Sequence, residues 1–519
     1  MASENEKAEL HKAIWGIADS VRGAVDGWDF KAYILCFLFY RFISEDLCEF
    51  IDEGEHEAGD PDFSYAAMSD GDAEAARAGI TEDKGYFILP SQLFCNVAKD
   101  PARDPELNVR VAGIFKAIEA SSVGQPSEKD FKGLFDDVDV TSNKLGGNLE
   151  ERCERLAKII IGIRDLDFGK VDESHIDLFG DAYEYLMNMY ASSAGKSGGE
   201  FFTPQEVSEL LARLTTQEQR NVNKIYDPAC GSGSLLLKAY RAARATSDAD
   251  VEVYGQEINL TTYNMCRINM ILHGVSYAKC DIALGDTLVS PKHWDYEPFD
   301  VIVSNPPYSI KWEGDKNPTL INDPRFAPAG VLAPKGNADL AFVMHALAWL
   351  SNKGAAAIVC FPGVFYRGGA EQKIRRHLVE QNNVDAVIAL PDNLFFGTSI
   401  ATNVLVLKKN KKDNRVLFVD ATREFVKVTK NNKLTEENIA KIADVVKNRR
   451  DIEYFSRVVP FDEIEKNKFN LTPSTYVEKP DTREKIDIVA LNAEIKRIVA
   501  REEELRRQID LIVADLEGV

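Results

Sequence analysis

From about residue 170 the chain alternates between short apolar runs of strand length and longer segments with apolar residues at helical spacing. This alternation predicts βα units, which pack into a doubly wound, mostly parallel α/β sheet with helices on both faces. The predicted strands are 224–226, 251–255, 281–284, 299–303, 355–361, 384–390, 402–407 and 416–419. The predicted helices between them include 260–272, 338–350 and 370–380. Such a fold binds nucleotides in many proteins, but it does not specify a function by itself.

The two ends of the chain carry other patterns. Residues 5 to about 165 are rich in helix formers with apolar residues at helical spacing, so we expect a helical N-terminal domain over 1–165. We expect the catalytic domain over 166–478 and a C-terminal helix over 479–519. That helix carries a seam in alternating steps of four and three, at Leu491, Ile495, Ile498, Glu502, Leu505, Ile509, Ile512 and Leu516. The heptad spacing favours packing on a partner protein over packing on its own domain.

The composition is that of a globular protein with two or three domains. Of the 519 residues 45% are hydrophobic, and the longest apolar run, 32–40, is shorter than the roughly 20 residues that cross a bilayer. The polar N-terminus does not resemble a signal peptide, so we expect a cytoplasmic protein with no membrane contact. Eight cysteines without a Cys-x-x-Cys pair and seven dispersed histidines predict reduced thiols and no metal site.

The net charge of −21 constrains how this chain could hold a nucleic acid. A protein that grips DNA alone is expected to carry a basic excess, because phosphate neutralisation dominates the affinity. This chain is acidic, so contact with DNA would be confined to a local patch. Most of the grip would come from another molecule, for example a basic partner subunit.

The strand predicted at 299–303 runs directly into Ser304, Asn305, Pro306, Pro307 and Tyr308. Open α/β sheets place ligands at this end of a strand. The Asn305 side chain offers a carbonyl acceptor, Pro306 can present its own carbonyl from a rigid backbone, and Tyr308 offers a face for stacking. These groups suit a flat base that carries an amine. A plain turn that ends the strand is the alternative that these five residues leave open.

The first strand of the sheet leads into a glycine turn. Asp227 precedes Gly231, Ser232, Gly233 and Ser234, and the two glycines allow a tight turn and close approach of backbone to a ligand. No Gly-Lys-Ser/Thr follows, so this is not a Walker loop, and the third glycine of the dinucleotide fingerprint is missing. A carboxylate before the glycines suits a ligand with an amino group better than a pyrophosphate.

Two further acids end the next strands. Glu257 follows the second strand, where Rossmann-type folds place an acid that accepts from both ribose hydroxyls. Asp286 follows the third strand and could accept from an adenine amino group. Because all these positions end successive strands, together they predict a nucleoside pocket.

A Gly-rich stretch, 194–199, leads into Glu200, Phe201, Phe202, Thr203 and Pro204. We expect Thr203 to cap the following helix, with Pro204 at its first position and Glu206 at the capping-box position. A plain capped helix would explain this pattern. Two phenylalanines beside a Gly-rich lead also suit a segment that closes over a ligand.

The segments 200–204, 227–233 and 305–308, in this order, resemble the amino-group DNA methyltransferases of the N6-adenine group, which use S-adenosylmethionine. The helical N-terminus, 304–309, 361–369 and the C-terminal helix are similar, more closely, to the modification subunit of type I restriction-modification enzymes. The resemblance covers essentially the whole chain and shows no departure in the catalytic motifs. It implies an adenine-specific DNA methyltransferase with a Rossmann-like catalytic domain.

The resemblance also implies roles for individual residues. The target adenine would be held by the Asn305, Pro306, Pro307 and Tyr308 motif, without a metal or a covalent intermediate. The methionine part of the cofactor would contact Glu200, Phe201, Phe202, Thr203, Pro204 and Gln205. The rest of the cofactor would lie at Asp227, Gly231, Ser232, Gly233, Ser234, Glu257 and Asp286.

The partners implied are DNA, a specificity subunit that reads the sequence and is joined by two copies of this chain, and a restriction subunit. Three other readings remain open from the residues. A methyltransferase for protein glutamine side chains could use the same strand-end motif. A non-catalytic scaffold would not need Asn305 and Glu257, and a self-sufficient DNA methyltransferase would need a larger basic segment than the sequence contains.

Overall fold

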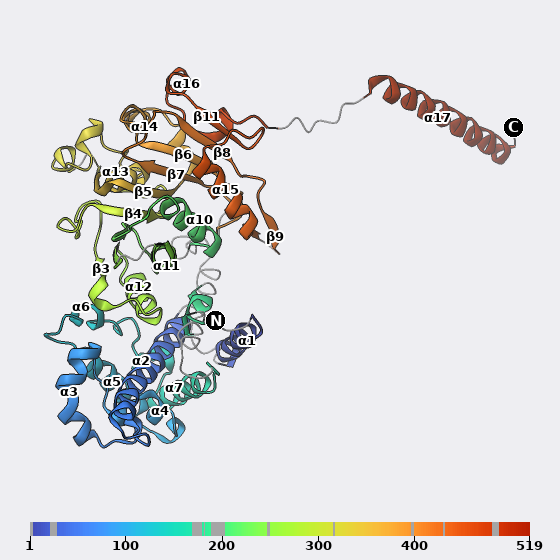
Figure 1. The fold of residues 1–519 in the computed structure, drawn as a ribbon. Coiled ribbons are helices and arrows are strands. Elements are labelled where there is room, and N and C mark those ends of the chain that lie inside the picture. The colour runs from blue at the N-terminus through green and yellow to red at the C-terminus, as the bar shows by residue number, and fades with distance from the viewer. Residues whose placement is uncertain are drawn as a thin grey trace. The chain divides into compact units, whose positions relative to one another are not determined.

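The computed structural model describes residues 4–20, 29–168, 179–180, 182–187, 203–246, 250–314, 317–395, 399–428, 431–479 and 487–518. Residues 1–477 form one compact unit, and residues 478–519 form a second (Figure 1). Among the described helices, none combines the length and the apolar character needed to cross a bilayer.

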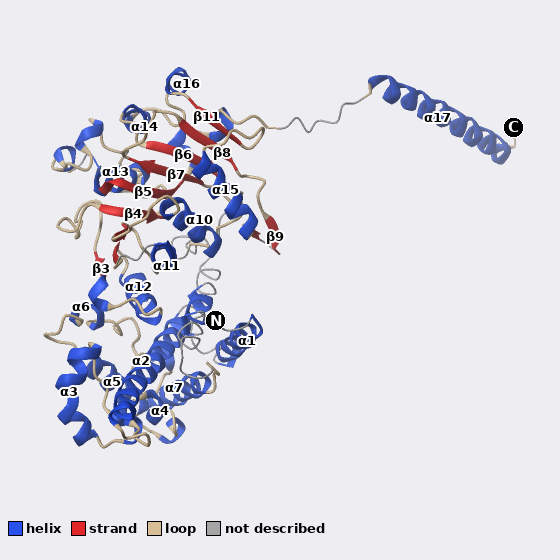
Figure 2. Ribbon diagram, viewed as in Figure 1, coloured by secondary structure: helices blue, strands red, loops and turns tan. Residues whose placement is uncertain are grey.

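A nine-stranded sheet forms the centre of the catalytic region (Figure 2). In spatial order its strands are β11 (Ser456–Val459), β8 (Val416–Asp420), β6 (Val384–Ala389), β7 (Asn403–Lys408), β5 (Leu350–Cys360), β4 (Phe299–Ser304), β1 (Lys224–Asp227), β2 (Glu252–Glu257) and β3 (Cys280–Leu284). The strand β7 runs antiparallel to both of its neighbours, and β11 runs antiparallel to β8. All other pairs in this sheet are parallel. The carboxyl ends of β1 to β6 and of β8 therefore lie at one edge.

Side chains of each strand alternate between two cores, as the period of a strand requires. On β4, Val301 and Val303 pack with α10 (Gln205–Thr216), α11 (Ser234–Thr246), α12 (Leu260–Leu272) and α15 (Glu436–Asn448). Ile302 points to the other face, where α13 (Asp339–Trp349) and α14 (Ala370–Glu380) cover the sheet. Both faces are thus buried, which explains the nearly continuous apolar runs in the central strands.

The N-terminal region is helical, as expected. Its helices are α1 (Glu4–Ser20), α2 (Asp29–Ala58), α3 (Asp70–Lys84), α4 (Phe94–Val97), α5 (Leu107–Ser121), α6 (Glu128–Phe131) and α7 (Leu149–Arg164). They share one apolar core, which also takes in Met265, Ile268 and Leu272 of α12. The helix that follows β2 therefore joins the helical region to the sheet.

All eight predicted strands are present, and the helices predicted at 260–272 and 370–380 coincide with α12 and α14. The strand β5 begins at Leu350, earlier than expected. The apolar pattern did not indicate this start, because residues 351–353 are polar and the strand follows α13 without a loop. The sequence pattern did not predict β11 or the hairpin of β9 (Val426–Val428) and β10 (Asn431–Lys433). These short strands have little apolar alternation, and pairing rather than pattern defines them.

The second unit contains α17 (Ile488–Glu517). Asp487 caps this helix, because its side chain accepts hydrogen bonds from the backbone N–H groups of Val489 and Ala490. None of its described residues is buried. The seven apolar residues of the heptad seam have exposed fractions between 44% and 81%.

Candidate active site

The ends of four neighbouring strands surround one cavity of about 310 Å³. The strands lie in the order β4, β1, β2, β3, so the chain reverses its direction of winding between β1 and β4. Ligands bind at such switch points in open α/β sheets. A residue at or just after the end of each strand lines the cavity, namely Ala229, Glu257, Asp286 and Asn305. The sheet thus brings together side chains from segments far apart in the sequence.

The glycine turn lies beside this cavity and orients Glu257, a residue of the cavity wall. The N–H of Gly231, a residue with a φ of 53°, donates to Glu257 Oε2 at 2.9 Å. Gly233 has a φ of 80°, and an added Cβ there would lie 2.7 Å from both Cys266 Sγ and Met270 Cε of α12. Only glycine therefore permits this turn and this packing. The carbonyl of Ser232 accepts from Asn269 Nδ2 of α12 at 3.1 Å, and Ser234 begins α11.

The two predicted strand-end acids face the cavity. Glu257 accepts from two backbone N–H groups, that of Gly231 and that of Asn259, the latter at 2.8 Å on Oε1. Asp286 Oδ1 accepts from the N–H of Leu288 at 2.9 Å. These bonds fix the orientation of both carboxylates. A carboxylate oxygen has two acceptor sites, so each oxygen so engaged keeps a site for a ligand.

Asp227, by contrast, lies beneath the site. Its side chain is buried, and its Oδ1 accepts from Ser304 Oγ at 2.8 Å and from the N–H of Ala229 at 2.9 Å. Among the described residues that line the cavity, Asp227 and the glycine turn do not appear. Burial raises the pKa of Asp227 to about 7, although these two hydrogen bonds oppose the rise. Asp227 thus links the turn after β1 to the residue that precedes Asn305.

Both ends of the Asn305 amide are engaged within the protein. Its Oδ1 accepts from the Tyr308 hydroxyl at 2.6 Å, and its Nδ2 donates to Thr203 Oγ1 at 3.1 Å. Asn305 and Pro307 line the cavity, and Pro306 is buried. Burial raises the pKa of Tyr308 well above its usual range, so its hydroxyl remains a donor. The carbonyl oxygen predicted to grip a base therefore already accepts from a side chain of the same motif, at one of its two acceptor sites.

The prediction that Thr203 caps the next helix is wrong. The helix α10 begins at Gln205, and Pro204 is its N-cap because its carbonyl already accepts from Val207 and Ser208. Thr203 lies one residue outside, where its hydroxyl accepts from Asn305 instead, and among the described residues no side chain caps the helix. Gln205 Nε2 donates to Glu184 Oε2 at 2.6 Å. The predicted residues Glu200, Phe201 and Phe202 lie outside the described residues.

Sequence reasoning missed the apolar part of the cavity wall. The side chains that provide it are Ile258, Ile310, Trp312 and Phe342. Ile258 is 67% exposed although it directly follows Glu257. A large apolar residue directly after a strand-end acid is visible in the sequence and could have indicated the apolar wall of a pocket. The other three come from the segments that follow Asn305, and only the fold brings them back to the cavity.

A buried arginine, also not predicted, holds the loop that carries Asp286. Arg325 donates from Nη1 to the carbonyl of Thr287 and from Nη2 to that of Leu288, both at 2.8 Å. It forms a salt bridge with Asp323 at 2.7 Å, and its side chain is only 1% exposed. His345 lies on the other side, with Nδ1 at 3.1 Å from Arg325 Nη1. Burial and the nearby guanidinium lower the pKa of His345 well below its usual range, so its ring is neutral.

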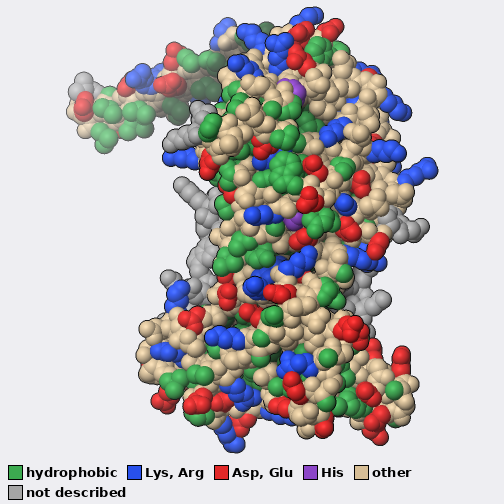
Figure 3. All heavy atoms as spheres, turned by 90° about the vertical axis from the view of Figure 1, so that its left-hand side faces the viewer, with side chains coloured by type: hydrophobic (Ala, Val, Ile, Leu, Met, Phe, Trp, Pro, Cys, Tyr) green, Lys and Arg blue, Asp and Glu red, His purple; other side chains and the backbone are tan. Residues whose placement is uncertain are grey.

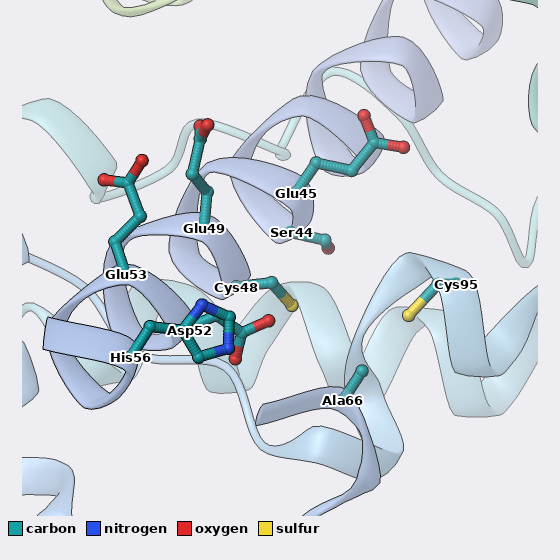
Figure 4. Close-up of a pocket in the computed structure, with 9 residues that line it drawn as sticks. All are labelled: Ser44, Glu45, Cys48, Glu49, Asp52, Glu53, His56, Ala66 and Cys95. Atoms are coloured by element: carbon teal, nitrogen blue, oxygen red, sulfur yellow. The ribbon is translucent and has the colours of Figure 1, made fainter. Parts of the chain in front are cut away.

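A second cavity, of about 420 Å³, lies in the helical region (Figure 4). Most of its acidic lining comes from successive turns of α2, where Glu45, Glu49 and Glu53 lie along one side. Cys48, on the same helix, and Cys95, on α4, face each other in this cavity. It contains none of the predicted site residues and no strand end. Although it is the larger cavity, the chemistry predicted from the sequence lies at the sheet edge.

Known proteins match both regions of this chain. Residues 174–485 match the family described as N-6 DNA Methylase, and residues 10–163 match the HsdM N-terminal domain. The chain is 48% identical to the type I restriction enzyme MpnII methylase subunit of Mycoplasma pneumoniae, over 98% of this chain and 96% of the relative. It is 31% identical to the MjaVII methylase subunit of Methanocaldococcus jannaschii, over 100% of this chain and 85% of the relative.

The fold gives the same answer. The crystal structure of the type I restriction-modification system methyltransferase subunit from Streptococcus thermophilus superposes with a TM-score of 0.81 at 35% identity. The match covers 91% of this chain and 100% of the other. A glutamine-directed protein methyltransferase would not explain a match that includes the helical N-terminal region. The chain therefore belongs to the N-6 DNA methylase family, as a methylase subunit of a type I restriction-modification system that methylates adenine in DNA at N6.

Proposed function

We propose that S-adenosylmethionine is the methyl donor and that the cavity at the ends of β1 to β4 holds it. The observation that carries this proposal is that Glu257, Asp286 and Asn305 line one cavity together with apolar side chains. Glu257 would accept from the two ribose hydroxyls, and Asp286 from the adenine amino group. Ile258 and Phe342 offer apolar surface for the flat base. The chain's residues thus fit the chemistry of this cofactor.

The methionine part would lie toward the glycine turn and the segment from Glu200 to Gln205. When bound, this cofactor supplies a methyl group activated by a positively charged sulfur. Gly231 holds Glu257 in place, and Asp227 ties the turn to Ser304. The same backbone therefore sets the positions of the donor pocket and of the target turn.

The target adenine must leave the DNA stack, because its N6 is out of reach inside a duplex. The Tyr308 ring would stack on the extruded base and offset part of the cost of unstacking. The Asn305 side-chain oxygen and the Pro306 carbonyl would accept from the two N6 hydrogens. At Asn305 Oδ1 the base would compete with the Tyr308 hydroxyl, which donates to this oxygen in the structure.

The acceptors act on the reaction through charge. The N6 lone pair is delocalised into the ring, which makes this nitrogen a poor nucleophile. Two acceptors on its hydrogens favour a tetrahedral nitrogen whose lone pair faces the methyl group. Positive charge grows on N6 during transfer, so acceptors fixed in advance stabilise the transition state more than the ground state.

The cofactor role of Glu257 is tested by calorimetry with S-adenosylmethionine. We expect Glu257→Ala to weaken binding by about 1 to 3 kcal/mol, because the ribose hydroxyls lose their acceptor. Glu252→Ala is the matched control, since Glu252 lies at the other end of the same strand. Equal affinity of the Glu257 variant and the wild type would reject the assignment.

We also propose that two copies of this chain join one specificity subunit through the α17 seam, and that a restriction subunit can join them. The support is the exposure of all seven apolar seam residues and the acidic net charge, which calls for a partner to grip DNA. Deletion of 491–519 should abolish association with the specificity subunit in size exclusion and leave cofactor affinity intact. Lys496→Glu, outside the seam, should leave the complex intact. A complex that survives the deletion would contradict this role.

A further inference from the structure

The hairpin of β9 and β10 is the feature that the site leaves unexplained. It forms a sheet of its own, apart from the nine-stranded sheet (Figure 2). All three residues of β9 are exposed. The segment 423–433 contains Arg423, Lys427, Lys430 and Lys433 against a single acid, Glu424, so it is basic in a chain with a net charge of −21.

The cations of this hairpin are available to a partner. Arg423, Lys427 and Lys433 are exposed, and within the described part of the chain they form no salt bridge. Lys430 lies outside the described residues. The acid Glu424 is already paired with Lys441, at 2.6 Å. Basic and acidic side chains are interspersed on the face drawn in Figure 3.

The hairpin is anchored at the edge of the sheet that carries the active site. It follows β8, whose carboxyl end lies at the same edge as that of β4. Asn432 fixes it to the loop after β6. The Asn432 N–H donates to the carbonyl of Asn393 at 3.0 Å, and Nδ2 donates to the carbonyl and Oδ1 of Asp392, both at 2.9 Å. The position of the hairpin is therefore determined by the sheet.

The hairpin also lies on the target side of the site. In the sheet order, β6 and β8 lie on the side of β4 opposite to β2 and β3, whose ends form the cofactor cavity. Lys433 interacts electrostatically with Glu206, in the first turn of α10. That helix begins shortly after Thr203, which holds Asn305. A duplex that presents a base to Asn305 would thus pass close to these cations.

We propose that the β9–β10 hairpin contacts the DNA backbone beside the target base, through phosphates that meet Arg423, Lys427 and Lys433. Charge complementarity identifies the occupant, because phosphates are the dense anionic partner that a DNA methylase must meet. The contact positions the duplex for base extrusion and carries no sequence information. An acidic surface of a protein partner is the competing occupant, and the experiment below separates the two.

The test compares the double variant Lys427→Gln/Lys433→Gln with wild type, as the complete complex with the specificity subunit. We expect the KM for DNA to rise about tenfold near physiological salt. The slope of log KM against log salt should fall by about two, one for each phosphate that no longer meets a lysine. Turnover at saturating DNA and the affinity for S-adenosylmethionine should not change, which separates this proposal from the assignment of the active site.

The matched control is Lys353→Gln/Lys466→Gln, with the same loss of charge. Lys353 is near the start of β5 and Lys466 follows β11, so both lie toward the opposite edge of the sheet. A KM and a salt slope equal to those of this control would overturn the proposal. Loss of the specificity subunit from the hairpin variant, seen by size exclusion, would also overturn it and assign the hairpin to a protein contact.

Discussion

The cofactor side and the target side of the active site differ in how far their polar groups are already arranged to bind a ligand. On the cofactor side, Glu257 and Asp286 are oriented by backbone N–H groups and still face the cavity. On the target side, Asn305 Oδ1 is occupied by Tyr308, and Nδ2 is occupied by Thr203. The cofactor side needs no rearrangement to accept hydroxyl and amino donors, whereas on the target side an internal hydrogen bond already takes one acceptor site of Asn305 Oδ1 and competes with the base.

This difference suggests an order of events. A preformed cofactor pocket costs little entropy when a ligand binds, because its groups are already held. The target turn stays closed on itself until a base arrives with N–H groups that compete with the Tyr308 hydroxyl. An unpaired acceptor at this half-buried turn would be costly, so Tyr308 satisfies Asn305 while no base is present.

The largest effect should come from breaking the target side alone. We expect Asn305→Ala to slow methyl transfer in the complete complex by roughly a hundredfold or more, as for loss of a preorganised polar group. Cofactor affinity by calorimetry should stay the same, because Glu257 and Asp286 are held by backbone N–H groups and not by this amide. Asn322→Ala, an exposed asparagine of the following loop, serves as the control. Unchanged turnover of the Asn305 variant would refute the assignment.

The Tyr308 ring and hydroxyl can be separated by two substitutions. Tyr308→Ala should lower the efficiency of methylation by roughly tenfold to a hundredfold, because it removes the stacking face for the base. Tyr308→Phe keeps the face and frees Asn305, so extrusion of 2-aminopurine at the target position, read by fluorescence, should be at least as favourable as in wild type. If both variants lose extrusion equally, the hydroxyl does more than satisfy Asn305.

The loop that carries Asp286 can be weakened by a substitution at a residue that does not face the cofactor cavity. Arg325→Lys keeps the charge but loses the fork that holds the carbonyls of Thr287 and Leu288. We expect roughly tenfold weaker binding of S-adenosylmethionine, equivalent to one or two hydrogen bonds, with turnover recovered at saturating cofactor. The control is Arg376→Lys, whose arginine forms an exposed salt bridge with Glu380. A loss of turnover that saturation does not restore would show that Arg325 serves the target side as well.

An effect on stability rather than on activity concerns Asp227, which connects the two sides. Its folded-state pKa of about 7 lies above the usual value for an aspartate, so the folded state retains a proton that the unfolded state loses above about pH 4. The contribution of Asp227 to stability is therefore full below that pH and falls as the pH rises toward 7, by at most about 4 kcal/mol.

Asp227→Asn removes this dependence and keeps an acceptor for Ser304. We expect its thermal midpoint, relative to wild type, to be higher at pH 8 than at pH 4.5 by a few degrees in a unit of this size. Scanning calorimetry at the two pH values gives the comparison. A difference that is the same at both pH values would show that Asp227 is ionised in the folded protein.

Much of the catalytic region could be predicted from sequence because its central strands are apolar and buried on both faces. The strand ends then located Glu257, Asp286 and Asn305 at one edge, since parallel strands end together. The apolar pattern did not predict β11 or the β9–β10 hairpin, because apolar and polar residues do not alternate regularly there. It also failed at Thr203, because the sequence Thr-Pro reads as a cap whether or not the threonine side chain has another partner.

The sequence by itself determined the fold class, the order of the motifs and the chemical types at the site, because these follow from local periodicity and from residue identity. Only the tertiary structure decided which groups meet. It brings Arg325 into contact with the loop that carries Asp286, and it places Trp312 and Phe342 in the cavity wall. It also positions the Tyr308 hydroxyl to donate to Asn305. Such contacts depend on side chains that converge from distant segments, and their distances depend on packing that no local pattern contains.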